Sequence, residues 1–398
     1  MLRNPDLRRS LPDIEADDVD RRLADGWTLP ASLYTSPAVA EAEDELVFRP
    51  GWHLVGTLAD FREAGDYLTT FLGGKYPIIV ARDFEGALRG FHNVCRHRGC
   101  LVAGGETGDV TCGQGQTQRF RCIYHGWTYG LDGRLIGVPD FRGARLPPFE
   151  ELGLVPISID TWAGLVFASI EPDSPLSTVV SGLAREADAA GYTMPFLNPE
   201  MRFVSDWEFV LRANWKVSLE NNLECYHCAV THSKTLGGAC DVGAASMGST
   251  DFENGNRIYT QLSADVESYF PADVITLLRA GTSASSEEPM QQYWLWPTNL
   301  FTTSVLFGDA IFRIDPIDVG SCRFIGRAYS RPGEEESTRA KLNDWIGEFV
   351  SEDIGVASGV QIGLQSGARE TGPLLYKREG SISWCSELIW RHLGPAFR

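Results

Sequence analysis

Two short motifs near residue 100 constrain this chain more than any other feature. The first is Cys95-Arg96-His97-Arg98-Gly99 and the second is Cys122-Ile123-Tyr124-His125-Gly126-Trp127. Together they supply two thiolates and two imidazoles, which are ligands of transition metals. Each motif fits the tip of a short hairpin, and two such tips facing each other can enclose a metal group.

Two metal groups use this ligand set. A Rieske [2Fe–2S] cluster binds one iron through two cysteines and the other through two histidines, which raises its reduction potential. A structural zinc ion also takes two cysteines and two histidines. Zinc fingers usually pair cysteine with cysteine and histidine with histidine along the chain, whereas each motif here contains one of each. The mixed order favours the iron–sulfur cluster.

Residues 95–127 resemble the Rieske domain of the ring-hydroxylating and N-demethylating oxygenases. The cluster ligands that this resemblance implies are Cys95, His97, Cys122 and His125. The stretch between the two motifs is longer than this family leads us to expect. We interpret the excess, Thr111 to Gln118, as an enlarged surface loop because it is rich in Gly and Gln.

A disulfide beside the cluster is not expected. Respiratory-chain Rieske proteins have an extra cysteine in each cluster loop, and the two form a disulfide. Cys100 occupies the first of these positions, but Tyr124 occupies the second. This difference favours the oxygenase branch of the family. Cys112 is not expected to substitute as a partner, because disulfides are rare in a reducing cytoplasm.

The composition excludes several classes of protein. The chain has 398 residues, 43% of them hydrophobic, and a net charge of -18. This size predicts two domains, and without a basic stripe a nucleic-acid partner is not expected. No apolar run reaches the ~18 residues of a membrane helix. The charged N-terminus lacks the apolar region of a signal peptide, so we expect a cytoplasmic protein without membrane contact.

The hydrophobic pattern predicts an α+β fold in three regions. Residues 1–45 form a helical lead-in that packs on the catalytic domain, and residues 46–160 form an all-β Rieske domain. Residues 161–398 form a C-terminal catalytic domain with an antiparallel sheet covered by helices. Within it we expect a helix starting near Asn214 and a long helix from Ser337 to about Gln361.

A second group of metal-binding residues follows Asn214. His227 and His232 are five residues apart, which is about 140° on a continuous helix. Both can bind one metal ion only if the helix deforms or ends between them. Two histidines and a carboxylate form the facial triad of mononuclear non-haem Fe(II). The carboxylate must come from elsewhere in the chain.

The resemblance implies that Asp353, within the long helix, is the third ligand. A carboxylate among apolar neighbours is costly to bury unless it is paired or bound to a metal. Its neighbour Glu352 is expected to face solvent. The remaining histidines are interpreted as structural; they are His53, His92 and His392.

Glu224 lies three residues before His227, so on a helix the two would share a face. The family places an acidic residue here as a bridge between the two metal sites. The family forms trimers, in which each Rieske cluster serves the iron of a neighbouring subunit. Glu224 is therefore expected to connect His227 to His125 of the next subunit. A purely orienting role for Glu224 remains the alternative.

The resemblance implies an oxygenase α subunit that uses O₂ and electrons from a separate NAD(P)H-dependent flavin/iron–sulfur reductase. No Gly-x-Gly-x-x-Gly fingerprint places a reductase in this chain. Glu224 in a Glu-Cys-Tyr-His-Cys setting is similar to the carnitine, glycine betaine and stachydrine oxygenases. That branch implies a small quaternary ammonium or N-methylated substrate and oxidative N-demethylation or C–N cleavage.

Two alternatives stay open. The same metals would also serve hydroxylation of an aromatic acid or related ring compound. A Rieske-type electron carrier is the alternative of another class, but it has no use for a second iron site. Trp294, Trp296 and Phe301 could form an aromatic wall for a cation; for each of them a plain core position is the preferred interpretation.

Overall fold

The computed structural model describes residues 2–104, 113–140, 145, 147–189, 194–233, 235, 237, 247–260, 290–304, 308–333 and 336–398. The chain divides into two compact units. The β unit comprises Arg49–Leu176 and Phe196–Pro199. The α+β unit comprises Met1–Phe48, Ser177–Pro195 and Glu200–Arg398. Among the described residues, none of the helices is long and apolar enough to cross a membrane.

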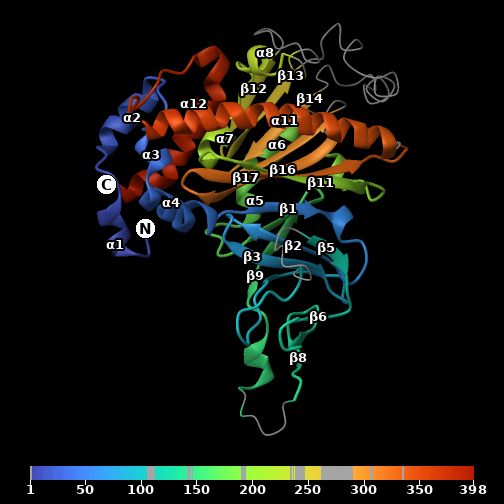
Figure 1. The fold of residues 1–398 in the computed structure, drawn as a ribbon. Coiled ribbons are helices and arrows are strands. Elements are labelled where there is room, and N and C mark those ends of the chain that lie inside the picture. Colours follow the sequence, from blue (N-terminus) through green and yellow to red (C-terminus); the bar gives the residue numbers. More distant parts are fainter. Residues whose placement is uncertain are drawn as a thin grey trace. The chain divides into compact units, whose positions relative to one another are not determined.

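Among its described residues, the β unit contains two antiparallel sheets (Figure 1). The larger sheet has the order β1-β10-β9-β4-β3-β2-β5. Its strands are β1 (His53–Thr57), β2 (Asp66–Leu72), β3 (Tyr76–Arg82), β4 (Leu88–His92), β5 (Gly113–Gln116), β9 (Pro156–Trp162) and β10 (Leu165–Ser169). The smaller sheet consists of β6 (Phe120–Arg121), β7 (Thr128–Tyr129) and β8 (Leu135–Gly137). Two 3₁₀ turns belong to this unit as well, η2 (Leu58–Asp60) and η3 (Phe149–Leu152).

Two hairpins in this unit follow from turn residues. The Asp132-Gly133 turn joins β7 to β8, and Gly133 has a φ of 82°. Ala163 and Gly164 both have positive φ, 51° and 83°, and they join β9 to β10. Because this hairpin adds β10 to the larger sheet, the β unit continues to Leu176, beyond residue 160, where the sequence placed the domain boundary.

The segment rich in Gly and Gln differs from its predicted surface loop. Residues Gly113–Gln116 form β5, which pairs with β2 at the edge of the larger sheet. Thr111 and Cys112 lie outside the described residues. A strand with so few apolar residues carries no alternating hydrophobic pattern, so periodicity gave no sign of it.

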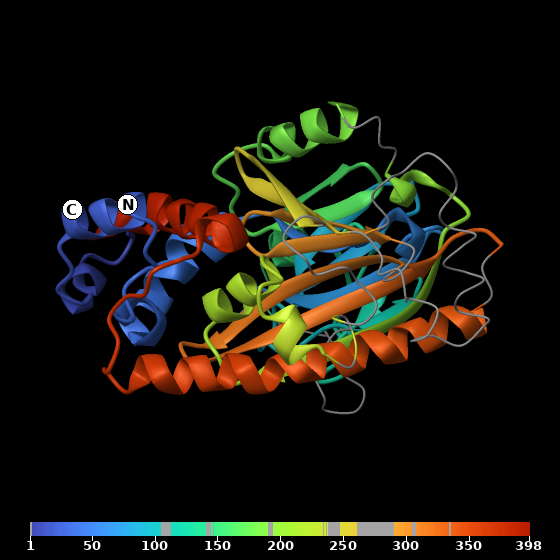
Figure 2. The ribbon, with the colours of Figure 1, turned by 90° about the horizontal axis from the view of Figure 1, so that it is seen from above.

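The α+β unit is built on one antiparallel sheet with the order β11-β17-β16-β15-β14-β13-β12. Its strands are β11 (Arg202–Leu211), β12 (Met247–Phe252), β13 (Gly255–Thr260), β14 (Met290–Leu295), β15 (Asn299–Ser304), β16 (Gly308–Asp318) and β17 (Ser321–Ser330). Figure 2 shows the long helix α11 (Glu336–Gln365) running along one face of this sheet. This arrangement confirms the predicted catalytic-domain architecture.

The other helices are short except for α12 (Tyr376–Leu393). The N-terminal region is helical as predicted, with α1 (Pro5–Ser10), α2 (Ala16–Ala24), α3 (Ser32–Thr35), α4 (Pro37–Glu43) and η1 (Asp44–Phe48). Among the described residues, the remaining helices of this unit and its boundaries are α5 (Leu176–Val179), α6 (Ser181–Ala189), η4 (Pro195–Leu197), α7 (Trp215–Asn222), α8 (Cys228–Thr231) and η6 (Gly394–Ala396). Asn214 caps α7 as predicted, since its side chain accepts a hydrogen bond from the N–H of Lys216.

The core of the α+β unit explains why Asp353 lies on the buried face of α11. Val350, Ala357 and Leu364 are buried at a spacing of seven residues, and they belong to the cluster formed with the sheet. Residues three and four apart share a helix face. Asp353 lies three after Val350 and four before Ala357, so it lies on the same buried stripe. This periodicity directs the carboxylate inward.

Candidate metal centres

Two loops of the β unit, 95–100 and 122–127, have matching backbone hydrogen bonds. In each loop the N–H of the cysteine donates to the carbonyl oxygen five residues later, at 2.8 and 2.9 Å. In each loop a glycine N–H, that of Gly99 or Gly126, donates back to the cysteine carbonyl, at 3.0 and 2.9 Å. These glycines have φ of 74° and 73°, a left-handed conformation that favours glycine. The Gly at the same position of both motifs is therefore explained by the turn.

The loops bring the four predicted cluster ligands together in two layers. Cys95 and Cys122 are buried, whereas His97 and His125 are exposed. The two imidazole rings lie with their centroids 4.6 Å apart. Burial raises the pKa of the Cys95 thiol, so its thiolate needs a nearby positive charge. Sulfur donors inside and nitrogen donors outside fit the ligand set of a Rieske cluster.

Two aromatic residues next to these ligands were missed in the sequence. The ring of Trp127 stacks on His97 at a centroid distance of 4.9 Å. The Tyr129 hydroxyl lies 3.2 Å from Cys95 Sγ and accepts a hydrogen bond of 3.0 Å from the N–H of Arg96. Because that oxygen already accepts from Arg96, its own proton can point to the sulfur. The motif Gly-Trp-Thr-Tyr after His125 was the signal for both.

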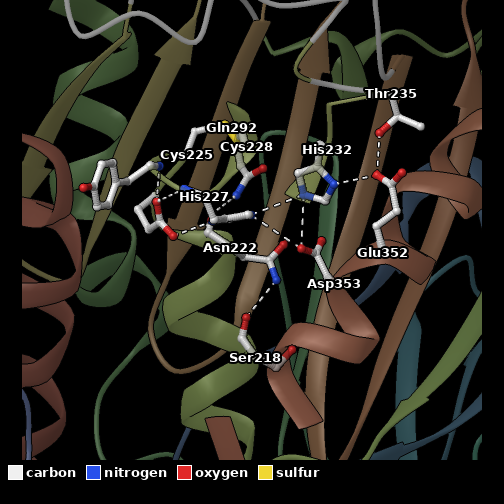
Figure 3. A network of polar contacts seen from close by, with 12 residues as sticks. Ser218, Asn222, Cys225, His227, Cys228, His232, Thr235, Gln292, Glu352 and Asp353 are labelled. Carbon is white, nitrogen blue, oxygen red and sulfur yellow. Dashed lines mark hydrogen bonds and ion pairs between the residues drawn. A yellow bond between two sulfur atoms is a disulfide. The ribbon is translucent and has the colours of Figure 1, made fainter. Parts of the chain in front are cut away.

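The second group of donors converges in the α+β unit (Figure 3). His227 is the N-cap and His232 the C-cap of the single-turn helix α8, so the helix lies between the two histidines and stops at His232 rather than between them. Their Nε2 atoms are 3.2 Å apart. Asp353 Oδ1 lies 3.1 Å from Nε2 of His232 and 3.5 Å from Nε2 of His227. Three atoms from two elements thus point at one place.

The hydrogen bonds around this place identify its chemistry. Nδ1 of His227 donates to Glu224 at 2.5 Å and Nδ1 of His232 donates to Glu352 at 2.8 Å. A carboxylate only accepts, so each ring carries a proton on Nδ1, and in the neutral imidazole the lone pair is on Nε2. Asp353 Oδ1 is buried and makes no hydrogen bond of good geometry. Three acceptors facing one another fit a metal cation.

The pKa values of His227 and Asp353 also indicate a site for a cation. Burial lowers the pKa of His227, but the carboxylates of Asp353 and Glu224 outweigh it and raise the pKa to about 9. Burial raises the pKa of Asp353, but the imidazoles of His227 and His232 outweigh it and lower the pKa to about 2. The site therefore favours a positive charge at its centre.

The predicted solvent-facing position of Glu352 is wrong. Its Oε2 accepts hydrogen bonds from His232 Nδ1 and from the Thr235 hydroxyl, the latter at 2.6 Å. The Glu352 side chain is 26% exposed. Adjacent positions on a helix differ by about 100°, but a side chain as long as Glu reaches round the helix. Position on the helix alone did not show this contact.

Glu224 contacts His227 as predicted, but not from the face of a shared helix. It lies in the loop between α7 and α8. Its carboxylate accepts from the backbone N–H groups of Tyr226 and His227 as well as from the His227 ring. These local bonds fix the carboxylate against the ring without a helix.

Cys225 and Cys228 form a disulfide on either side of His227 (Figure 3). From the sequence, a disulfide was considered only beside the cluster, so this one was not predicted. The two residues are neighbours because the turn between α7 and α8 brings positions three apart together. Cys228 Sγ lies near both histidines, but in a disulfide it is not a thiolate ligand. Cys100 is a free cysteine.

The candidate aromatic wall divides between two faces of the sheet. Trp294 is fully buried, and its Nε1 donates to the Pro297 carbonyl at 3.1 Å. Trp296 stacks on His392 at 4.3 Å. Phe301 stacks on Tyr293 at 4.9 Å. All three have satisfied packing partners, which supports the core interpretation.

The two regions that contain these donor sets match known protein families. Residues 51–150 match the family described as Rieske [2Fe-2S] domain, and residues 198–392 match the family described as Ring hydroxylating alpha subunit (catalytic domain). These two families imply a Rieske cluster and a mononuclear iron as cofactors.

Curated relatives match either about half or nearly all of this chain. Glycine betaine monooxygenase oxygenase subunit of Chromohalobacter salexigens is 34% identical over 56% of this chain and 47% of its own length. Chloroplastic choline monooxygenase of Spinacia oleracea is 34% identical over 52% of this chain and 46% of its own length. The chain thus spans about half the length of these relatives. Carnitine monooxygenase oxygenase subunit of Acinetobacter baumannii is 27% identical over 92% of this chain and 94% of its own length.

Solved structures show the same fold. The quaternary ammonium Rieske monooxygenase CntA in complex with L-carnitine has a TM-score of 0.76 at 24% identity, covering 96% of this chain and 99% of that one. Naphthalene 1,2-dioxygenase from Rhodococcus sp. has a TM-score of 0.73 at 19% identity, covering 99% of both chains. With a Rieske domain and a ring-hydroxylating catalytic domain in one polypeptide, the chain belongs to the Rieske non-haem iron oxygenase α subunits.

Proposed function

We propose that this chain is the oxygenase component of a two-component system that hydroxylates a small N-methylated ammonium compound. The observation that carries the proposal is the convergence of three acceptor atoms on one point, His227 Nε2, His232 Nε2 and Asp353 Oδ1. An electron carrier has no use for such a site. The oxygenase subunits for glycine betaine, choline and carnitine share a quaternary ammonium substrate, which supports the substrate class.

Each metal group has its own residues. The β unit holds the [2Fe–2S] cluster through Cys95, His97, Cys122 and His125. The α+β unit holds Fe(II) through His227, His232 and Asp353. When bound, the cluster supplies single electrons and the iron supplies O₂ activation for the oxidation of a C–H bond. The chain's part is to hold both imidazoles by their Nδ1 protons, so that their lone pairs are available at Nε2.

We place electron transfer between subunits of a homotrimer, with Glu224 joining His227 to His125 of a neighbouring copy. His125 is exposed, and the adjacent Ile123 and Tyr124 are 62% and 55% exposed. Large apolar side chains exposed beside a functional group are typical of an interaction surface. An NAD(P)H-dependent flavin/iron–sulfur reductase supplies the electrons, which is consistent with a cytoplasmic enzyme.

The test is a substrate screen of the iron-loaded chain with a generic reductase, measuring O₂ uptake and aldehyde release together. We expect carnitine, choline or a betaine to couple O₂ uptake to formaldehyde or another aldehyde. The shared fold of naphthalene 1,2-dioxygenase makes a ring compound the second candidate. Tight coupling to a benzoate-like ring with no response to ammonium compounds would refute the substrate class and keep the oxygenase reaction.

A further inference from the structure

The His232 ring is held at both nitrogens by two adjacent residues of α11. Asp353 Oδ1 lies 3.1 Å from Nε2, and Glu352 Oε2 accepts from Nδ1 at 2.8 Å. A ring fixed at both ends cannot rotate about its Cβ–Cγ bond without breaking a contact. Figure 3 shows the ring between these two carboxylates.

The two carboxylates that contact the histidine Nδ1 atoms differ in where they are anchored. Glu224 is fixed by backbone N–H groups of its own loop, three residues from His227. Glu352 is 120 residues away from His232 and lies on another element. The Thr235 hydroxyl donates to the same Glu352 oxygen at 2.6 Å. Glu352 thus connects the segment after α8 to α11 through two hydrogen bonds.

We propose that Glu352 is a positioning residue of the mononuclear site, orienting His232 and setting the affinity of the site for its metal ion. The inference rests on the proposed ligand set of His227, His232 and Asp353. Partners that orient a metal-bound histidine change metal affinity by about 10–100-fold when they are removed. We expect a loss in that range for Glu352→Ala.

The length and the charge of the Glu352 side chain make separable contributions to the metal affinity. Glu352→Asp shortens the side chain by about 1.5 Å, one C–C bond, and should lose the Nδ1 contact. Glu352→Gln keeps the length and an oxygen acceptor but loses the charge. The affinity of this variant for the metal ion should therefore lie between those of the wild type and Glu352→Ala. Thr235→Val removes one of the two bonds that hold the carboxylate, whereas Thr235→Ser keeps it.

The experiment is an anaerobic titration with Fe(II), and with Co(II) as a spectroscopic probe, of the cluster-loaded protein. The readouts are the dissociation constant and the ligand-field spectrum of Co(II), neither of which requires turnover. Glu348→Ala is the matched control because Glu348 is an exposed carboxylate on the same helix. Far-UV circular dichroism and the cluster absorbance report folding. If Glu352→Ala does not fold, Glu352→Gln and Thr235→Val carry the test.

We expect weaker metal binding and an altered Co(II) spectrum for Glu352→Ala and Glu352→Asp. Thr235→Val should show a smaller effect. Thr235→Ser and Glu348→Ala should behave like the wild type. Wild-type affinity and spectrum in Glu352→Ala would overturn the inference. If Asp353→Ala loses the metal while the Glu352 variants keep it, only the inference fails. If the wild type itself binds no ion at this site, the proposed function fails.

Discussion

Tyr129→Phe should lower the reduction potential of the Rieske cluster. The Tyr129 hydroxyl lies 3.2 Å from Cys95 Sγ, and its oxygen accepts from the N–H of Arg96. Burial and the Cys95 thiol raise the pKa of Tyr129 well above its ordinary value, so the hydroxyl keeps its proton and donates it to the sulfur. A donor to a cluster sulfur stabilises the reduced form, which carries the more negative charge.

The magnitude follows from the strength of one hydrogen bond. A hydrogen bond to a charged group contributes about 1.5–3 kcal/mol. The reduction potential changes only by the amount by which this bond is stronger in the reduced cluster than in the oxidised one. If that gain is about one third, or about 0.5–1 kcal/mol, the potential falls by about 20–40 mV, because 59 mV corresponds to a tenfold change for one electron.

The assay is a dye-mediated redox titration followed by visible circular dichroism. Tyr76→Phe is the control, because Tyr76 packs against a different hydrophobic cluster of the β unit. The cluster content must match that of the wild type in both variants. An unchanged or higher potential in Tyr129→Phe would refute the reasoning, and an equal fall in Tyr76→Phe would assign the effect to packing.

Further predictions concern the iron site, electron transfer between subunits and stability. Asp353→Ala should lose the mononuclear iron and all turnover while the visible spectrum of the cluster survives; retained iron would mean that another carboxylate is the ligand. Glu224→Gln should keep both metals and slow the oxidation of the reduced cluster, and a mixture of Cys122→Ser and His232→Ala subunits should regain activity in mixed trimers. No recovery after verified subunit exchange would place transfer within one chain. Burial raises the pKa of Glu220 to about 7 from 4.5. Between these two pH values the folded chain keeps a proton that the unfolded chain has lost. The free energy of unfolding therefore falls by at most about 3 kcal/mol as the pH rises from about 4.5 to 7. Glu220→Gln should reduce this pH dependence of the thermal midpoint, and an unchanged slope would contradict the assignment.

The sequence predicted best what depends on short spacing. The cysteine–histidine motifs needed only local turns, and their glycines have the left-handed conformation that those turns require. The long helix was predicted at Ser337–Gln361 and extends over Glu336–Gln365. Asp353 was assigned by resemblance, although the spacing of Val350, Ala357 and Leu364 also places it on the buried face.

The features that the sequence did not predict depend on contacts between distant segments. Glu352 and Asp353 are adjacent, and no periodicity distinguishes a solvent-facing carboxylate from one that reaches an imidazole 120 residues away. Strand β5 exists because β2 offers an edge for pairing, not because of its own composition. The disulfide depends on a turn whose geometry is set by α7 and α8.

A hydrogen bond between Gly237 and His232 closes the segment that follows α8. The N–H of Gly237 donates to the His232 carbonyl at 2.8 Å. A Cβ at position 237 would lie 2.8 Å from the Cys228 carbonyl oxygen and 2.9 Å from that of His232, closer than a side chain tolerates. Gly237 therefore lets the backbone fold onto α8 after a single turn. That reversal brings Thr235 to the Glu352 carboxylate, so a glycine outside the donor set helps to determine how His232 is held.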